Sequence, residues 1–265
     1  MNVRINARGR LEDWRTGPTG PAYWAEYFSK ANVRRELEVA RSTGIGDIGE
    51  VLRRHLPRRG LIVEAGCGLG RVVAALRSWG YDCAGIDSSR ECIARALELM
   101  PDLPVAYGDA RALDFPDAST AGCISLGVIE HERAGPQPFL AEMHRVLQPG
   151  GVAVVSVPFE NGVRRLKKRL GLYPCSLPEG DWQFYQHVFS RETFVAFAEG
   201  AGFELLREYD VGAGRGLSRE FRLMRRLEEL SPSLWWQIVR PWHYVAALKS
   251  LVANMHVVVA RKPVA

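Results

Sequence analysis

The stretch Leu61-Ile-Val-Glu-Ala-Gly-Cys-Gly-Leu-Gly70 decides the fold of this 265-residue chain. A short apolar run ends in an acid, and three glycines follow at alternate positions. The next segment, Arg71 to Trp79, has the apolar spacing of a helix, and Gly80 is a typical helix end. The stretch therefore predicts a buried strand, a tight turn and a helix N-terminus, which is where open parallel sheets bind ligands.

The same rhythm of strand and helix continues to residue 157. Apolar runs at 82–87, 103–107, 121–126 and 152–157 alternate with helical patterns that end at glycine or proline, and two further strands are expected at 203–209 and 255–260. Alternation of this kind predicts an α/β fold with a doubly wound, mostly parallel sheet and helices on both faces.

The flanking segments lack this rhythm. Residues 1–20 are polar and predict a poorly ordered or draped leader, followed by helices from Tyr23 to Arg41 and from an Asp47 N-cap to Leu56. Insertions at 158–189 and 212–254 interrupt the C-terminal half, and we expect them to form a helical substrate cap. The predicted division is 1–57 for the leader and its helices and 58–265 for the sheet domain with its cap.

Composition and charge narrow the class of protein. The chain is 47% hydrophobic with a net charge of +5, and no apolar run approaches the ~20 residues of a membrane span. We therefore expect a cytoplasmic protein. The five cysteines show no C-x-x-C spacing, which predicts buried reduced thiols and no metal site.

The glycine spacing and four later motifs carry a family resemblance. Gly66-Cys-Gly-Leu-Gly70 lacks the third glycine of a dinucleotide fingerprint, because Arg71 stands there, and this disfavours a nicotinamide dehydrogenase. With the preceding acid, the stretch resembles motif I of class I S-adenosylmethionine-dependent methyltransferases. The matching motifs that follow, in order, are Gly85-Ile-Asp87, Gly108-Asp-Ala110, Leu126-Gly-Val-Ile-Glu-His131 and Leu147-Gln-Pro-Gly-Gly151.

The Leu126 to His131 motif resembles that of the methyltransferase type 11 subgroup, which includes ubiquinone and menaquinone biosynthesis methyltransferases. The resemblance implies a Rossmann-like sheet of seven strands in the order 3-2-1-4-5-7-6, with the last strand antiparallel. It also implies S-adenosyl-L-methionine as the cofactor.

Position in the motifs implies a role for each cofactor-binding residue. Glu64 would hold the methionine ammonium group, Asp87 the ribose hydroxyls, and Asp109 with the Ala110 backbone the adenine edge. The other implied cofactor-binding residues are Gly66, Cys67, Gly68, Gly70, Ser88, Gly127 and Val128. Structural roles remain open for the three acids: Glu64 as a strand-end acid, Asp87 as a helix cap and Asp109 as a turn residue.

Three residues are candidates for the chemistry. A sulfonium methyl group is already activated, so positioning can do much of the work, and a base is needed only for a protonated acceptor. His187 on the first insertion is the preferred base, with Tyr185 as a partner, and His131 is a base or a residue that orients its loop. Structural roles remain open for both histidines.

We expect a methyltransferase for a small or amphiphilic acceptor, with oxygen as the favoured acceptor atom. Basic segments at 164–169 and 218–230 fit either peripheral membrane contact or solvated helices packed on the core. An RNA-modifying enzyme is the alternative, although no separate RNA-binding module is visible, so a nucleic-acid partner is not expected. A cofactor-binding module without catalysis is the alternative outside enzymes. The sequence leaves the oligomeric state undetermined.

Overall fold

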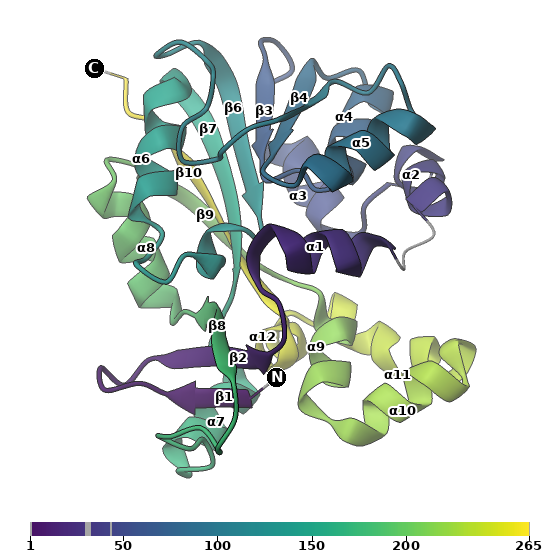
Figure 1. The fold of residues 1–265 in the computed structure, drawn as a ribbon, viewed down its shortest axis with the longest axis vertical. Helices are drawn as coiled ribbons and strands as arrows, with labels where there is room; N and C mark the ends of the chain where they lie inside the picture. Colours follow the sequence, from purple (N-terminus) through teal and green to yellow (C-terminus); the bar gives the residue numbers. More distant parts are fainter. Residues whose placement is uncertain (1, 30–32, 43, 265) are drawn as a thin grey trace.

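The main feature of the fold is a seven-stranded sheet, seen in a computed structural model that describes residues 2–29, 33–42 and 44–264 (Figure 1). Its spatial order is β5-β4-β3-β6-β7-β10-β9. The bounds are β3 (Ile62–Ala65), β4 (Cys83–Asp87), β5 (Val105–Tyr107), β6 (Thr120–Leu126), β7 (Leu147–Pro158), β9 (Glu204–Val211) and β10 (Met255–Arg261). Numbered along the chain within this sheet, the order is 3-2-1-4-5-7-6, which confirms the prediction.

Strand directions also agree with the prediction. The pairs β3–β4, β3–β6, β4–β5 and β6–β7 are parallel, whereas β10 is antiparallel to both of its neighbours. Val258 of β10, for example, lies opposite Val155 of β7 and Glu208 of β9. The parallel strands end at one edge, where β6 reaches α1 (Figure 1).

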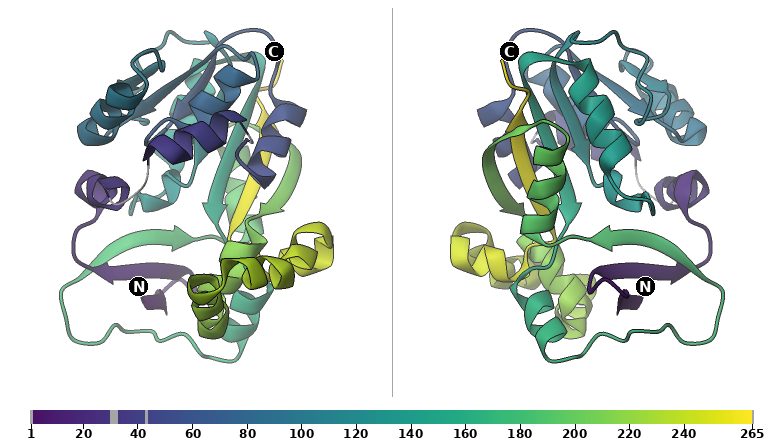
Figure 2. Two further views of the ribbon diagram at one scale, coloured as in Figure 1. Left: turned by 90° about the vertical axis from the view of Figure 1, so that its right-hand side faces the viewer. Right: turned by 90° about the vertical axis from the view of Figure 1, so that its left-hand side faces the viewer.

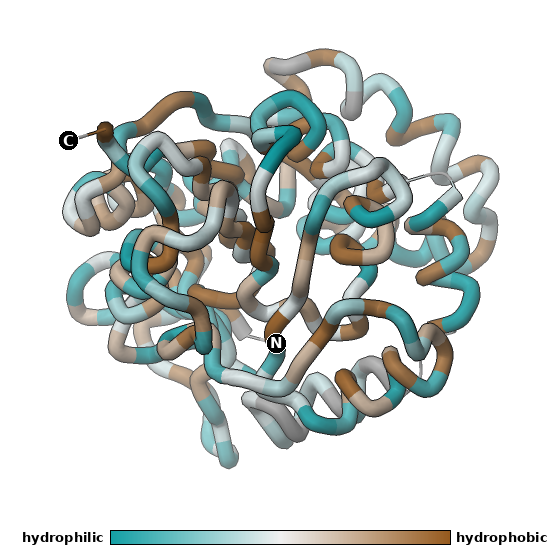
Figure 3. The backbone as a smooth tube through the Cα atoms, turned by 90° about the horizontal axis from the view of Figure 1, so that it is seen from above, coloured by the Kyte–Doolittle hydropathy of each residue, from teal (hydrophilic) through white to brown (hydrophobic). Residues whose placement is uncertain are grey.

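Helices cover both faces of the large sheet. One face packs against α3 (Asp47–His55), α4 (Arg71–Ser78) and α5 (Arg90–Leu99), the other against α6 (Gln137–Val146) and α8 (Arg191–Gly200). Successive residues alternate between the two cores, as Val154 and Val155 do, because strand side chains point to opposite faces. Hydrophobic segments accordingly run through the middle of the molecule (Figure 3). Four of the cysteines are buried as predicted, whereas Cys175 is exposed.

Helix starts test the predicted caps. The Ser190 hydroxyl accepts the Thr193 N–H at 3.2 Å, which confirms the predicted N-cap of α8. Ser89 caps α5 in the same way through Cys92. The Asp47 prediction is wrong by one residue, because α3 begins at Asp47 and Gly46 is its N-cap, without a side-chain bond.

Residues 2–16 form a hairpin, so the prediction of a draped leader is wrong. Strands β1 (Asn2–Ile5) and β2 (Leu11–Thr16) pair antiparallel, and β2 pairs with β8 (Trp182–Val188). The resulting small sheet, β1-β2-β8, lies beyond the edge where the parallel strands end (Figures 1 and 2). The first insertion is therefore helical only at α7 (Gly162–Arg169). The leader prediction failed because the strand that pairs with β2 lies far along the chain.

The second insertion is helical, as predicted. It contains α9 (Ala213–Glu220), α10 (Arg222–Leu230), α11 (Pro232–Tyr244) and α12 (Ala246–Val252). A separate hydrophobic cluster, with Leu217 and Val239 at its centre, joins these helices, and Trp235 and Trp242 pack against it. Within the described residues, none of the helices has both the length and the apolar character of a bilayer span.

The predicted helical stretch from Tyr23 to Arg41 overlaps two helices, α1 (Gly20–Ser29), which begins three residues earlier, and α2 (Val33–Ser42). Residues 30–32, between these two helices, lie outside the described part of the chain. Helix α2 packs on α4, and α1 contacts α5. The segment that follows the hairpin therefore runs along the edge of the large sheet.

Candidate cofactor and acceptor site

The glycine turn lies between β3 and α4. The N–H groups of Gly66 and Cys67 donate to the Ile86 carbonyl at 2.7 and 3.0 Å, which ties the turn to β4. Gly66 has φ +88°, and a Cβ there would lie 2.3 Å from Val128 Cγ2. Only glycine fits such a position, so the turn packs directly on the Gly127-Val128 segment that follows β6.

Asp87 fixes the open end of this turn. At the end of β4, its carboxylate accepts the Gly68 N–H at 2.7 Å and the Ser89 N–H at 2.8 Å. Ser88, which lies between Asp87 and Ser89 in the chain, is exposed. A carboxylate offers about four lone-pair sites, so Asp87 can hold the loop and still accept two hydroxyl groups.

Glu64 is a buried acid with an unused oxygen. Its side chain at the end of β3 is 3% exposed, and Oε2 has no hydrogen-bond partner among the described residues. Burial, and then the nearby Asp87, raise the pKa of the Glu64 carboxyl well above its usual value. An unpartnered buried polar atom is costly, and an ammonium group in the turn would satisfy it. The unpartnered Glu64 oxygen therefore fits the ammonium group of S-adenosylmethionine.

Asp109 follows β5 beside the buried Ala110. The Arg111 guanidinium donates to Asp109 Oδ2 at 2.8 Å and to Oδ1 at 3.0 Å, and these bonds lower the pKa of the Asp109 carboxyl. Arg111 also reaches Glu132 at 3.0 Å, across the edge of the sheet. Asp109 thus has a structural partner, and its contact with adenine stays a prediction.

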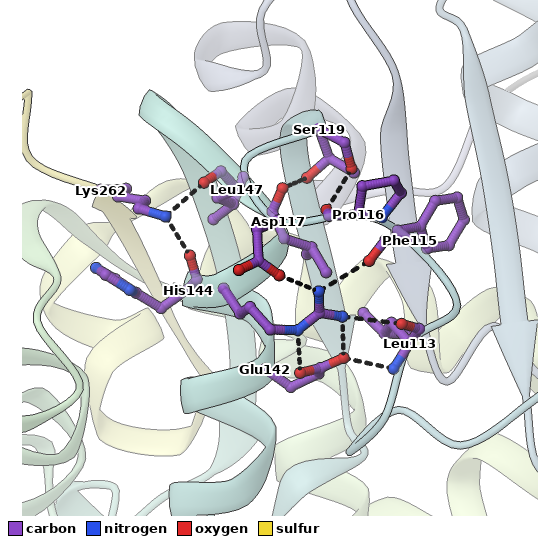
Figure 4. A network of polar contacts seen from close by, with 12 residues as sticks. Leu113, Phe115, Pro116, Asp117, Ser119, Glu142, His144, Leu147 and Lys262 are labelled. Atoms are coloured by element: carbon purple, nitrogen blue, oxygen red, sulfur yellow. Dashed lines mark hydrogen bonds and ion pairs between the residues drawn. The ribbon is translucent and has the colours of Figure 1, made fainter.

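A polar network holds the next connection, residues 113–119, on α6. The Arg145 guanidinium donates to Glu142 and Asp117 and to the carbonyls of Leu113 and Phe115, at 2.6–2.9 Å. Figure 4 shows these acceptors converging from α6 and from the connection. Asp109 and Ala110, which are predicted to border the adenine, directly precede this anchored segment, so the network stiffens the chain next to them.

The Glu130-His131 pair forms a 3-10 turn, η1 (Ile129–His131), after β6. Burial raises the pKa of the Glu130 carboxyl to about 8, and its Oε2 has no partner among the described residues. His131 Nδ1 lies 2.7 Å from the Tyr185 carbonyl, and Nε2 lies 4.0 Å from Glu130 Oε1. Burial lowers the pKa of His131. Because a carbonyl only accepts, Nδ1 carries the proton and Nε2 keeps a lone pair.

An aromatic wall connects His131 to the small sheet. The His131 ring centroid is 4.8 Å from that of Tyr185 and 5.3 Å from that of Trp24. Tyr185 in turn packs edge-on against Tyr23 of α1 at 5.3 Å. Burial raises the pKa of the Tyr185 hydroxyl, so it stays protonated. The structure therefore brings Tyr185 and His131 together beside the end of β6.

His187 lies on the other face of the small sheet. The β2–β8 register shifts so that Trp14 opposes Phe184 while Asp13 opposes Gln186, which makes Tyr185 the extra residue of a bulge. His187 packs on Phe184 at 4.7 Å, and its Nε2 lies 3.2 Å from the Arg133 carbonyl. The predicted partnership of Tyr185 with His187 is therefore wrong, because the bulge turns them to opposite faces.

The inner face of the small sheet, on which Tyr185 lies, carries charged residues that the sequence analysis missed. Asp13 is 5% exposed, and its Oδ1 has no partner among the described residues. Two nitrogens of Arg15, Nε and Nη1, are also buried without a partner there. The sequence carried one signal: Asp13 and Arg15 are two residues apart, and side chains with that spacing share one face of a strand. Across the described residues, no cluster of three His, Cys, Asp or Glu side chains is arranged to hold a metal.

Comparison with known proteins places this geometry among methyltransferases. Residues 63–155 match the family model described as a methyltransferase domain. A Mycolicibacterium smegmatis protein named a probable S-adenosylmethionine-dependent methyltransferase is 34% identical over 157 residues, covering 59% of this chain and 57% of that protein. The Synechocystis 2-methyl-6-phytyl-1,4-hydroquinone methyltransferase is 35% identical over 112 residues, covering 38% of this chain and 33% of that enzyme.

The aligned parts thus span between a third and about three fifths of these relatives' lengths. Among solved structures, a Haloferax volcanii complex of the Trm112 methyltransferase activator with a methyltransferase matches at a TM-score of 0.60 and 17% identity. The match covers 94% of this chain and 100% of that one, and it shows a shared fold.

Proposed function

We propose that this chain, whose residues 63–155 match the model of a methyltransferase domain, transfers the methyl group of S-adenosyl-L-methionine to a small or amphiphilic acceptor. The observation that carries the proposal is the buried, unpartnered oxygen of Glu64 beside the glycine turn. An acid in that position needs a cationic ligand, and the cofactor has an ammonium group.

Each end of the cofactor has residues to hold it. Glu64 binds the ammonium group, Asp87 binds the ribose hydroxyls, and Asp109 with Ala110 borders the adenine. The Gly127-Val128 segment, packed on the turn, borders the methyl end. The cofactor supplies a methyl group bonded to positively charged sulfur, so the main task of the protein is to align an acceptor atom with that methyl carbon.

Oxygen is the proposed acceptor atom, and His131 is the proposed base. Its Nε2 lone pair can take the proton of a hydroxyl group, while the Tyr185 carbonyl holds Nδ1–H and so fixes the ring. Above about pH 8, where the Glu130 carboxyl is ionised, its oxygen 4.0 Å from Nε2 would stabilise the resulting imidazolium. We do not assign this step to His187, because it lies on the opposite face of β8 from Tyr185.

Two aspartates that flank one strand provide a test with a matched control. Asp87 is the last residue of β4, whereas Asp82 directly precedes the strand and makes an exposed ion pair with Arg77 at 3.0 Å. Asp87→Ala should weaken S-adenosylhomocysteine binding by about tenfold or more, since charged hydrogen bonds are lost, whereas Asp82→Ala should leave it unchanged. Calorimetry measures both affinities, and equal affinities in the two variants would refute the assignment.

Turnover needs a separate measurement. Protein incubated with labelled S-adenosylmethionine and a fractionated cell extract should transfer label to a small or lipid-soluble product. Label in RNA would support the RNA-modifying alternative. Binding of S-adenosylhomocysteine without transfer to any fraction would support a non-catalytic module.

An exposed apolar stripe on α11 supports an amphiphilic acceptor at a lipid surface. Leu234, Ile238, Pro241 and Val245 follow one another at helical spacing and are all exposed. Helices α10 and α11 also carry four arginines but only two glutamates. These residues are Arg222, Arg225, Arg226, Arg240, Glu228 and Glu229. An apolar stripe with excess positive charge favours anionic lipid.

The other basic segment, 164–169, is largely used within the protein, because Arg164 and Lys167 pair with Glu220 and Lys168 pairs with Glu160. The stripe on α11 is therefore the expected contact with lipid. Sedimentation with phosphatidylglycerol vesicles should capture the protein, and Ile238→Asp should reduce the amount captured. The matched change Leu166→Asp on α7, also at an exposed leucine, should not reduce it. Equal sedimentation with phosphatidylcholine vesicles would contradict the electrostatic part of the proposal.

A further inference from the structure

Arg15 is held between aromatic rings with two donors unused. Its Cζ lies 3.8 Å from the centroid of Tyr23 and 5.3 Å from that of Tyr185. Rings of this kind orient a guanidinium group but do not satisfy its N–H groups. Nε and Nη1 are both buried and lack partners among the described residues. This arrangement leaves a free donor on two different sides of the guanidinium group, and an anionic group can bind at either of them.

The charges around Arg15 favour an anion. Arg219 of α9 is largely buried and donates to Asn254 Oδ1 at 2.9 Å. Its positive charge acts to lower the pKa values of Asp13 and Tyr185. The opposing acids are Asp13 and Glu130, and burial raises the pKa of both carboxyls. Glu130 therefore keeps its proton at neutral pH. Among Arg15, Arg219, Asp13 and Glu130, Asp13 is then the one carboxyl that can offset the two guanidinium charges, so this group of residues carries excess positive charge.

The same face is connected to the expected methyl position. Arg15 stacks on Tyr23 and Tyr185, Tyr185 packs on His131, and His131 belongs to the turn that follows Gly127-Val128. An acceptor between Arg15 and His131 would thus have rings along its length and one polar group at each end. The unpartnered Oδ1 of Asp13 adds an acceptor for a further hydroxyl.

We propose that the methyl acceptor is an organic acid that carries a hydroxyl group, and that Arg15 binds its anionic group while His131 faces the hydroxyl. This inference rests on the methyltransferase function proposed above. In the transfer, the hydroxyl oxygen forms a bond to the methyl carbon as the carbon–sulfur bond breaks. The hydroxyl proton passes to His131 Nε2, and the sulfonium becomes the neutral thioether of S-adenosylhomocysteine.

Calorimetry on the full chain saturated with S-adenosylhomocysteine tests the anion site with three probes that share a phenol ring: 4-hydroxybenzoate, 4-hydroxybenzamide and tyramine. The carboxylate should bind about tenfold or more tightly than the neutral amide and the cationic amine, because only it forms a charged pair with Arg15. Arg15→Gln should remove the preference, and Arg15→Lys should retain part of it. Arg10→Gln is the control, since Arg10 lies over the Phe197 ring at 5.9 Å and is exposed.

Three results would overturn the inference. The first is equal binding of the benzoate and the amide, or no benzoate binding up to about 10 mM. The second is a charge preference that survives in Arg15→Gln. The third is loss of S-adenosylhomocysteine affinity in Arg15→Gln, which would assign Arg15 to the cofactor's own carboxylate. Failure of the methyltransferase proposal is distinct, because the unmutated protein would then not bind S-adenosylhomocysteine before any probe is added.

Discussion

The large sheet and the small sheet differ in how far apart along the chain their strands lie. In the large sheet, β3, β4 and β5 follow one another within residues 62–107, joined by single helices. In the small sheet, Leu11 pairs with Val188, which lies far along the chain. The residues proposed to bind the methyl donor lie on the large sheet, whereas Arg15 and Tyr185, proposed for the acceptor, lie on the small sheet. The proposed donor site therefore depends on local segments, and the proposed acceptor site depends on a long-range pairing.

The small sheet has its own stabilising contacts. Trp14 is 8% exposed, meets Phe184 edge-on at 5.9 Å and lies under the Arg4 guanidinium at 4.3 Å. Glu12 accepts hydrogen bonds from the Trp14 ring, from Arg4 and from Asn6. These contacts lie within β1, β2 and β8 and the turn between β1 and β2. We therefore expect the small sheet to open separately from the large one.

The largest expected effect separates the two sheets. Trp14→Ala should lower the stability of the small sheet by about 3–5 kcal/mol, the usual cost of removing a buried tryptophan side chain. Hydrogen exchange should speed up in β1, β2 and β8, while S-adenosylhomocysteine affinity stays the same. Trp236→Ala is the control, because Trp236 is 49% exposed. Equal loss of protection in β3 and β6 would show that the two sheets unfold together.

The next prediction concerns the large sheet. Gly66→Ala should lower the free energy of unfolding by about 2–4 kcal/mol and weaken S-adenosylhomocysteine binding, since the new methyl group meets Val128 and the backbone is left-handed. Gly80→Ala is matched in backbone, with φ +83°, but its Cβ would enter open space. Denaturant titration should show a smaller loss for Gly80→Ala. Similar losses would mean that backbone strain alone, without the contact to Val128, accounts for the effect.

The smallest effect concerns Glu130, where the two sheets meet. Its folded pKa of about 8 exceeds the usual 4.5, so folding favours the protonated carboxyl. This contribution is complete below about pH 4.5, declines as the pH rises through 8 and is then lost. Between pH 5 and 8, the unmutated protein should lose on the order of 2 kcal/mol relative to Glu130→Gln, less than the full shift because relaxation admits water. Urea titrations check this, and parallel pH profiles would show that Glu130 does not titrate there.

Local sequence was enough to predict most of the large sheet. Apolar runs such as Val152 to Val157, helix-ending glycines and the Ser190 cap lie within a few residues of the structure they specify. The order of the strands came from the family resemblance, and the structure confirms it. The glycine turn was predictable from its alternate glycines, whereas the contact that closes the space at Gly66 comes from Val128, far along the chain.

The acceptor side was not predictable in this way. Residues 1–20 contain few apolar residues, and β2 pairs with β8 as well as with its hairpin partner β1. The bulge at Tyr185 then sets which side chains face His131, because one extra residue reverses the alternation. For this reason Tyr185 lies with His131, while His187 points the other way.

The sequence by itself therefore predicted the strands, the helices and the glycine turn, because helical and strand periods and turn residues act over short distances. The strand order and the cofactor came from the family resemblance. The tertiary structure alone decided that Asp13, Arg15 and Glu130 are buried with unpartnered atoms near His131 and Tyr185. Burial and strand register are properties of the packed chain, since they depend on segments that meet only after folding.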